Sequence, residues 1–386
     1  MFKAEELFQN ITDKNHPDET VLTIIQGKGT LPREQAGRNI HYDDASLSNY
    51  KKVEQGDFII HLRSFEGGLE MANEAGIVSP AYTILRCKRP HSSLFYDAYF
   101  HTDEFINHNL SKSVEGIRDG RQISYEAFKW LGIPYCEPTE QEKISNLFAA
   151  LNERIAKQRD LIEALKKYKR GLSNSLFDRL SAGSESRLCI FGDMMTILQN
   201  NTFSRDNLSV GDNGVRNIHY GDVLIKYGAV LDLHSENVPV INAEQDISKF
   251  SALSYLRNGD VVFADTAEDY TVGKSTEIIG AENIAALSGL HTIPCRPQDS
   301  FVPMYLGYYF NSDYFKKQLY PMIQGTKVSS ISKSEIIKTK IIVPCLQEQA
   351  RIASIMSALD DRIDAAKHTT KDLIDLRSGL LQQLFI

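Results

Sequence analysis

The stretch EQEKISNLFAALNERI at residues 140–155 returns at residues 348–363 as EQARIASIMSALDDRI, without a gap. With the same offset, residues 140–177 and 348–385 are identical at 12 of 38 positions. An insertion in a helix would rotate one face out of register, so a gap-free repeat of this length indicates a pair of long helices. The repeat therefore predicts a chain of two equivalent halves, each of which ends in one long helix.

Apolar residues recur along both copies in alternating steps of four and three, which is the 3.5-residue period of a coiled coil. This seam predicts that the two helices pack against each other, each about 60 Å long for 40 residues at 1.5 Å per residue. The alternative, two amphipathic helices each packed on its own domain, explains the apolar stripes but not so narrow a seam. The seam residues are Ile144, Leu151, Ile155, Leu165, Leu172, Ile352, Leu359, Ile363, Leu373 and Leu380.

The start and the weak points of the seam can also be read from the sequence. Thr139 and Glu142 form a T-x-x-E capping box after Pro138, which predicts where the first helix begins. Both copies carry a poor seam residue at the same place, with Lys169 aligned to Arg377.

The segments before the two helices have diverged, yet short motifs recur in the same order. They are RNIHY at 38–42 and 216–220, GDFII at 56–60 with GDVVF at 259–263, and FHTDEF at 100–105 with FNSDYF at 310–315. We therefore expect a tandem duplication with domains at 1–137 and 181–343 and helices at 138–180 and 344–386. Because the second helix must return along the first to bury its seam, the fold is predicted to be α+β, with two pseudo-symmetric mixed α/β domains separated by a long antiparallel two-helix coiled coil.

Composition points to an ordinary globular protein in the cytoplasm. Hydrophobic residues make up 42% and charged residues 24% of the chain. No apolar run approaches the roughly 18 residues that span a bilayer, and the N-terminus lacks the apolar core of a signal peptide. The five widely spaced cysteines form no C-x-x-C motif, which argues against a zinc site.

Catalytic motifs are missing from the sequence. There is no N/D-P-P-Y/F motif of an amino-methyltransferase and no phosphate-binding loop of an ATP-driven motor. The ten histidines show no metal-ligand spacing. We therefore predict no catalytic residue, no metal and no cofactor.

Several of these segments together resemble the specificity subunit of type I DNA restriction–modification systems. The resemblance is carried by IPYCEPTEQEKI (133–144) and IVPCLQEQARI (342–352) at the helix starts, by GDFIIHLRSFEGGLEMANEAGIVSPAYTIL (56–85) and GDVVFADTAEDYTVGKSTEI (259–278), and by IQGTKVSSISKSEIIKTKIIVP (323–344). The first copy departs from the last of these, reading EGIRDGRQISYEAFKWLGIP (115–134).

The resemblance implies a non-catalytic subunit. Each globular part would be a target-recognition domain that reads one half of a bipartite double-stranded DNA sequence. The helices would set the spacer between the half-sites and dock two methyltransferase (modification) subunits, and a restriction subunit with translocase activity would join this complex. We expect no membrane among its partners.

The charge distribution does not by itself predict a DNA-binding protein. The net charge of −7 divides into −5 for residues 1–137, +3 for 138–180, −4 for 181–343 and −1 for 344–386. Local basic groups can still bind phosphates, because the field close to DNA depends on nearby charges. We predict DNA contacts for the basic residues in Gly- or Ser-rich loops of the family-like segments: Arg63, Arg118, Arg121, Lys274 and Lys327.

An alternative function is a coiled-coil scaffold whose two globular ends bind proteins or ligands. Duplication and acidic charge fit a scaffold equally well, whereas the family-like segments inside the globular domains do not. Salt-sensitive binding to duplex DNA distinguishes the two functions.

Overall fold

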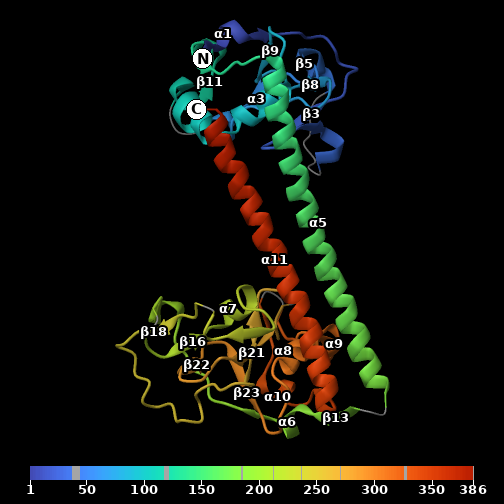
Figure 1. Ribbon diagram of the computed structural model, residues 1–386, viewed down its shortest axis with the longest axis vertical. Helices are drawn as coiled ribbons and strands as arrows, with labels where there is room; N and C mark the ends of the chain where they lie inside the picture. Colours follow the sequence, from blue (N-terminus) through green and yellow to red (C-terminus); the bar gives the residue numbers. More distant parts are fainter. Residues whose placement is uncertain are drawn as a thin grey trace. The chain divides into compact units, whose positions relative to one another are not determined.

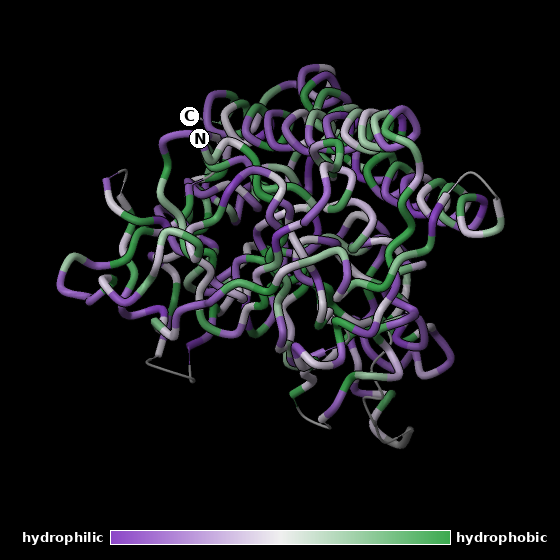
Figure 2. The backbone as a smooth tube through the Cα atoms, turned by 90° about the horizontal axis from the view of Figure 1, so that it is seen from below, coloured by the Kyte–Doolittle hydropathy of each residue, from purple (hydrophilic) through white to green (hydrophobic). Residues whose placement is uncertain are grey.

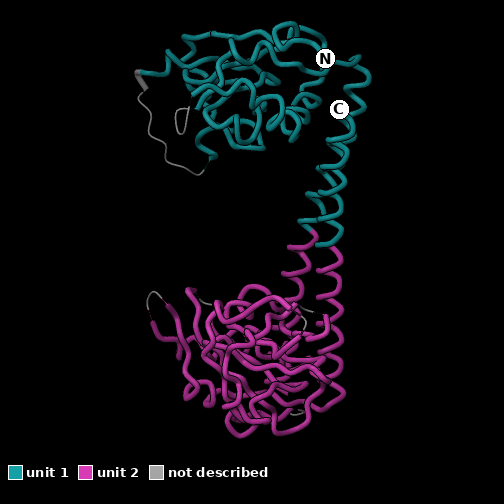
Figure 3. Tube along the Cα trace, turned by 90° about the vertical axis from the view of Figure 1, so that its left-hand side faces the viewer, with its two compact units in different colours: residues 1–160, 367–386 teal, residues 161–366 magenta. Residues whose placement is uncertain are grey.

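The computed structural model of the chain describes residues 1–36, 44–116, 121–183, 186–211, 213–235, 237–269, 271–325 and 328–385. It divides into two compact units, unit 1 (residues 1–160 and 367–386) and unit 2 (residues 161–366), shown in Figure 3. Each unit combines a mixed α/β domain with part of both long helices, α5 (Pro138–Ala182) and α11 (Leu346–Leu384) (Figure 1). The predicted fold class is confirmed.

The domain of unit 1 has one four-stranded sheet, in the order β2-β9-β6-β7, and four strand pairs, β1–β12, β3–β4, β5–β8 and β10–β11. Its strands are β1 (Phe2–Lys3), β2 (Phe8–Ile11), β3 (Leu22–Ile25), β4 (Gly29–Pro32), β5 (Lys51–Val53), β6 (Phe58–Ile60), β7 (Glu70–Met71), β8 (Gly76–Val78), β9 (Thr83–Cys87), β10 (Val114–Glu115), β11 (Gln122–Ile123) and β12 (Gly132–Ile133). Its helices are α1 (Ala4–Leu7), α2 (Ser64–Gly67), α3 (Ser93–Phe100) and α4 (Tyr125–Phe128).

The domain of unit 2 has a five-stranded sheet, β14-β23-β19-β21-β17, a four-stranded sheet, β15-β18-β16-β22, and the pairs β13–β25 and β20–β24. Its strands are β13 (Ser186–Ile190), β14 (Met195–Ile197), β15 (Leu208–Ser209), β16 (Arg216–Ile218), β17 (Val230–Asp232), β18 (Val240–Ile241), β19 (Val261–Ala264), β20 (Thr266–Ala267), β21 (Ser275–Ile279), β22 (Ala286–Ser288), β23 (Thr292–Pro297), β24 (Ser329–Ser330) and β25 (Lys340–Pro344). Its short helices are α6 (Phe191–Met194), α7 (Tyr220–Ile225), α8 (Tyr305–Phe310), α9 (Asp313–Leu319) and α10 (Lys333–Ile336).

The two domains share one antiparallel topology. The order β2-β9-β6-β7 in unit 1 is repeated by β14-β23-β19-β21 in unit 2, and a one-turn helix, α1 or α6, precedes the first strand in each case. The pair β1–β12 likewise corresponds to β13–β25. Unit 2 adds β17, which runs parallel to β21, and a second sheet. The duplication predicted from short motifs is therefore a duplication of the fold.

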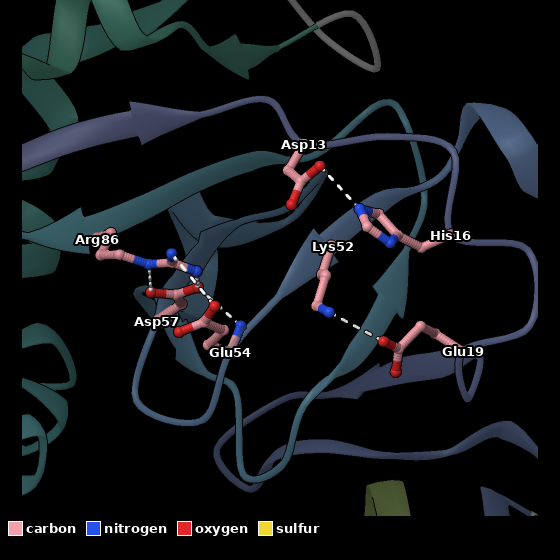
Figure 4. Close-up of polar contacts among 7 residues, drawn as sticks. All are labelled: Asp13, His16, Glu19, Lys52, Glu54, Asp57 and Arg86. Carbon is pink, nitrogen blue, oxygen red and sulfur yellow. Dashed lines mark hydrogen bonds and ion pairs between the residues drawn. The ribbon is translucent and has the colours of Figure 1, made fainter.

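The repeated Gly-Asp motif has a structural cause. In both domains the glycine has a left-handed backbone, with φ of 90° at Gly56 and 84° at Gly259, so the chain can turn sharply into β6 or β19. The aspartate that follows binds an arginine on the neighbouring strand through two hydrogen bonds. These bonds measure 2.8 and 2.7 Å from Arg86 to Asp57 and 2.8 and 2.6 Å in the equivalent pair of unit 2. Figure 4 shows the unit 1 pair.

The motif around FHTDEF and FNSDYF repeats as a buried hydroxyl next to an aromatic cluster. The Thr102 hydroxyl donates to the Tyr99 carbonyl (2.8 Å) and accepts from the Phe105 N–H (3.0 Å). Ser312 makes the same two bonds in unit 2, to the carbonyl of Tyr309 (2.5 Å) and from the N–H of Phe315 (3.2 Å). The hydroxyl satisfies the backbone where one helix ends and the next begins, so the rings can pack in the core.

A buried glutamine holds the start of each long helix. Gln141 accepts a hydrogen bond from the Ser92 N–H (2.9 Å) and donates to the Cys136 carbonyl (2.8 Å). Gln349 repeats this arrangement with the N–H of Val302 (3.0 Å) and the carbonyl of Pro344 (2.9 Å). This glutamine fixes each helix to its own domain, which gives the glutamine of the repeated Glu-Gln pair the same role in both copies.

The predicted capping box does not mark the helix start. Helix α5 begins one residue before Thr139, at Pro138, and the backbone carbonyl of Glu137 accepts the first helical hydrogen bonds. Proline suits the first helical position because it has no N–H to leave unpaired and its φ is already helical.

The seam residues named above are all buried or half-buried. In unit 2, Ile162 of α5 packs with Ile363 of α11, whereas Arg179, later in α5, is 3.1 Å from Glu348, earlier in α11. Residues later in α5 contact residues earlier in α11, so the two helices run antiparallel within the unit, as predicted. Figure 2 shows how hydrophilic and hydrophobic residues alternate along the backbone.

The weak seam position at Lys169 has a polar partner in unit 2. Its ammonium forms an ion pair with Asp360 of α11, and that carboxylate also accepts a hydrogen bond of 3.0 Å from the Tyr308 hydroxyl. The lysine is therefore paired within the helix interface rather than left unsatisfied.

The buried carboxyl of Glu277 on β21 makes the stability of the protein depend on pH. Burial raises its pKa to about 7, although the N–H groups of Met304 (2.7 Å) and Gly307 (2.8 Å) donate to it. The folded state holds the Glu277 proton more tightly than the unfolded state, because the folded pKa lies above the ordinary value of 4.5. The resulting stabilisation of the folded state is complete below pH 4.5 and is lost as the pH rises to 7. We expect the free energy of unfolding to fall by roughly 3 kcal/mol over this window. Urea unfolding at pH 5 and pH 8 measures the change, and the Glu277→Gln variant should lack it; an equal change in both proteins would contradict this assignment.

Candidate nucleic-acid interface

In unit 1, two predicted basic residues lie on neighbouring segments. Strand β6 is followed by the exposed Arg63, directly before α2. The guanidinium of Arg121, just before β11, lies 4.2 Å from the centroid of the Phe65 ring on α2. Such a cation–π contact holds the guanidinium against the face of the ring. The fold thus brings a segment near residue 63 and a segment near residue 121 to one place on the domain.

A hairpin tip is held against the same region. The buried carboxylate of Glu70 accepts hydrogen bonds from the N–H groups of Gly27 (2.6 Å) and Gly29 (2.8 Å), which flank the exposed Lys28 at the tip between β3 and β4. Burial alone would raise the pKa of Glu70, but the hydrogen bonds from His101 and the two glycines hold the pKa below its ordinary value. An anionic carboxylate therefore fixes the loop that carries Lys28.

Unit 2 presents different chemistry at the equivalent place. Strand β19, the counterpart of β6, is followed by Asp265 and then by Thr266 and Ala267, which form β20 and pair with β24. The imidazole of His291, from the turn before β23, lies 3.4 Å from the Asp265 carboxylate. A carboxylate with histidine and threonine thus stands where unit 1 has an arginine.

The remaining predicted DNA contacts are differently placed. Arg118 and Lys327 lie outside the described residues. Lys274 is half-buried, its ammonium donates to the Leu224 carbonyl (2.8 Å), and burial lowers its pKa. In this arrangement it ties the end of α7 to β21, and its contact with DNA stays a prediction.

Sequence reasoning missed His291 and the residues beside it. One signal was present, because the second RNIHY motif ends at His219 and Tyr220, next to this site, but it served only as a marker of the duplication. The Tyr220 ring lies 5.3 Å from the ring of His291.

Among the described residues, no group of three or more His, Cys, Asp or Glu side chains could hold a metal ion. Within the same part of the chain, no helix is both long and apolar enough to cross a membrane. The two candidate sites present hydrogen-bonding and basic side chains at the ends of sheet strands. Such groups suit recognition of a ligand by contact.

This chain resembles known proteins in sequence and in fold. The family model described as "Type I restriction modification DNA specificity domain" matches residues 193–375. No curated protein matches the sequence.

Three solved structures have a similar fold over 100% of this chain. The HsdS subunit from Thermoanaerobacter tengcongensis is 19% identical with a TM-score of 0.53, and 95% of that chain is covered. A second structure, described as "Structural basis underlying complex assembly and conformational transition of the type I R-M system", is 19% identical to this chain with a TM-score of 0.60, and 96% of that chain is covered. The type I restriction–modification S subunit from M. genitalium is 14% identical with a TM-score of 0.54 and 95% covered.

The architecture of two like α/β domains and two long helices is thus the fold of type I restriction–modification S subunits. The match to the type I restriction–modification DNA specificity domain covers residues 193–375. The specificity-domain match over these residues and the shared fold agree with the DNA sequence-specificity subunit that the sequence predicts.

Proposed function

We propose that each globular domain reads one half of a bipartite double-stranded DNA target. The observation that carries this proposal is that the two domains share their supporting contacts but differ in the side chains at the ends of equivalent strands. Equivalent Asp–Arg pairs and equivalent glutamine anchors support both domains. At the end of the equivalent strands, however, unit 1 presents Leu62 and Arg63 and unit 2 presents Asp265 and Thr266. Two readers built on one framework with different contact residues suit an asymmetric sequence.

The long helices would then determine the distance between the half-sites. Each of them contributes residues to both units, and the alternating apolar seam favours one fixed register between them. We propose that these helices also dock two methyltransferase subunits, to which restriction and translocase subunits attach. The subunit itself would carry out no catalysis.

The net negative charge of the two domains fits a subunit that recognises DNA bases but depends on partner subunits to hold the DNA backbone. Because neither domain is basic overall, methyltransferase partners would supply much of the phosphate contact, and this chain would supply base recognition. Binding of the isolated chain to DNA should accordingly be weaker than binding of the complex.

Exchange of one domain tests the proposal. Residues 1–135 are replaced by the equivalent domain of a relative, and the methylated sequence is determined in cells that also express the methyltransferase partner. One half of the methylated motif should change, while the other half and the spacer persist. A change in both halves together would contradict independent reading.

The two arginines of unit 1 give a second prediction. Arg63→Ala and Arg121→Ala should each weaken duplex binding by the complex, and each should reduce the slope of log K against log salt by about 1 if it contacts a phosphate. Fluorescence anisotropy over a salt series measures both effects. Lys129→Ala, which removes a charge already paired with Glu126 in the same domain, is the control. Equal slopes for all variants would remove these arginines from the interface.

A further inference from the structure

A compact polar cluster lies at the end of β19, made of Asp265, Thr266 and His291. The Thr266 hydroxyl donates to Oδ1 of Asp265 (2.8 Å), and Nδ1 of His291 lies 3.4 Å from both that oxygen and the threonine oxygen. Because both of these oxygens act as acceptors towards the ring, Nδ1 carries the proton and Nε2 of the neutral ring is an acceptor. The side chain of His291 is 48% exposed and that of Asp265 is 25% exposed.

One face of the cluster remains able to bind a ligand. Among the described residues, Oδ2 of Asp265 receives no hydrogen bond, since both contacts to this carboxylate use Oδ1. With the neutral ring, the cluster thus offers two acceptors, Oδ2 of Asp265 and Nε2 of His291, and carries a negative charge. Acceptors of this kind repel a phosphate and attract an amino group.

The position of His291 is fixed by its surroundings. Its backbone is left-handed, with φ of 55°, an uncommon conformation for a residue other than glycine and one that recurs at functional sites. Its carbonyl accepts a hydrogen bond from the Asp265 N–H (3.1 Å). The ring packs edge-on against Tyr220 at 5.3 Å, and Tyr220 in turn lies 4.6 Å from the ring of the buried His219.

The support continues beneath His219. Its Nδ1 accepts from the Gly221 N–H (3.2 Å) and faces Arg205 at 3.5 Å, so Nε2 carries the proton. Burial and the nearby Arg205 lower the pKa of His219, which keeps the ring neutral at pH 7. Arg205 is itself neutralised by two hydrogen bonds to Asp222, of 2.7 and 3.0 Å. A series of contacting side chains with no net charge therefore supports the exposed pair.

Among the residues of unit 1 that the structure describes, no such cluster lies at the equivalent strand end. The two domains can be aligned through the pairing of β6 with β9 and of β19 with β23. In this alignment Leu62 and Arg63 are equivalent to Asp265 and Thr266. Ala81 is equivalent to His291. Leucine and arginine suit a thymine methyl group and a guanine edge, whereas a carboxylate suits an amino group. The two domains therefore present different side chains at the same position of the shared fold.

We propose that Asp265 and His291 read an exocyclic amino group, N4 of cytosine or N6 of adenine, in the major groove of the half-site recognised by the unit 2 domain. This inference rests on the proposed function and adds the residues and the chemical group that they recognise. A carboxylate accepting from a base amino group is a direct readout contact that distinguishes base pairs by about tenfold or more.

The test uses the full chain with its methyltransferase partner. The wild-type methylated motif is determined first, and duplexes are then made with each base pair of the motif substituted in turn. Discrimination is the ratio of the binding constants for the wild-type and substituted duplexes. In the Asp265→Asn and His291→Ala variants, discrimination should fall about tenfold at one base pair carrying an amino group, in one half-site only. The methylated motif in cells should relax at the same base pair.

A matched control keeps this result interpretable. Asp299→Asn makes the same change of charge at an exposed position of the same domain and should leave discrimination unchanged. Wild-type discrimination at every base pair in both cluster variants would overturn the inference, as would a loss that Asp299→Asn reproduces. If a cluster variant no longer methylates DNA in cells, we measure its melting temperature and its discrimination between duplexes in vitro. An unchanged melting temperature with discrimination lost at one base pair supports the inference. Discrimination lost equally at every base pair overturns it. A wild-type protein without a bipartite motif would instead refute the proposed function.

Discussion

Replacing Phe385 by alanine is expected to lower the free energy of unfolding by about 3–5 kcal/mol and to release the end of α11 from unit 1. The ring is buried in the aromatic cluster of that unit, with centroid distances of 5.0 Å to Phe95, 5.4 Å to Tyr99 and 6.3 Å to Phe148. Its loss leaves a cavity that rings held by the surrounding helices cannot fill. Urea denaturation of the purified chain measures the effect.

The neighbouring Leu384 provides a matched control. It lies in the last turn of the same helix and is 41% exposed, so Leu384→Ala should change stability by less than about 0.5 kcal/mol. Phe177, the counterpart of Phe385 in the first repeat, packs 5.2 Å from Tyr309 in unit 2 and should respond as Phe385 does. Equal effects of the Phe385 and Leu384 variants would show that the helix end is not held by this ring.

Lengthening both long helices is expected to lengthen the spacer of the DNA target. Seven residues inserted after Asp160 and seven after His368 preserve the 3.5-residue seam. Each helix would grow by about 10 Å at 1.5 Å per residue. Since 10–10.5 base pairs of duplex span roughly 34–36 Å, the spacer should gain about three base pairs.

The added base pairs also rotate one half-site by nearly a third of a turn about the DNA axis. DNA twist or domain tilt must absorb this rotation, so affinity should fall while both half-sites persist. Sequencing of methylated genomic DNA from cells expressing the variant measures the spacer. An active variant with the original spacer would leave the helices only a docking role.

The sequence predicted the features that repeat and missed those that depend on pairing across the fold. The helices, their seam and the duplication follow from periodicity and from a gap-free match, which are local properties. Asp57 belonged to a repeated motif, but its partner Arg86 lies on another strand and carries no mark in the sequence. The role of Gln141 was equally hidden, because its partners, Ser92 and Cys136, precede the helix.

The candidate DNA contacts show the same division. Basic residues in Gly- or Ser-rich loops were selected by composition, which cannot distinguish an exposed cation from one bound to the protein. Arg63 is exposed, whereas the ammonium of Lys274 is held by a backbone carbonyl. None of Asp265, Thr266 and His291 is a lysine or an arginine, so a search for positive charge passed over these residues.

The most direct measurement is the methylome of a host that carries this chain together with its methyltransferase subunit. We expect methylation within one bipartite motif, with two specified halves separated by a spacer of fixed length, and no such methylation when the chain is omitted. A contiguous motif, or methylation of the same sequence without the chain, would contradict the account of two domains that each read one half-site.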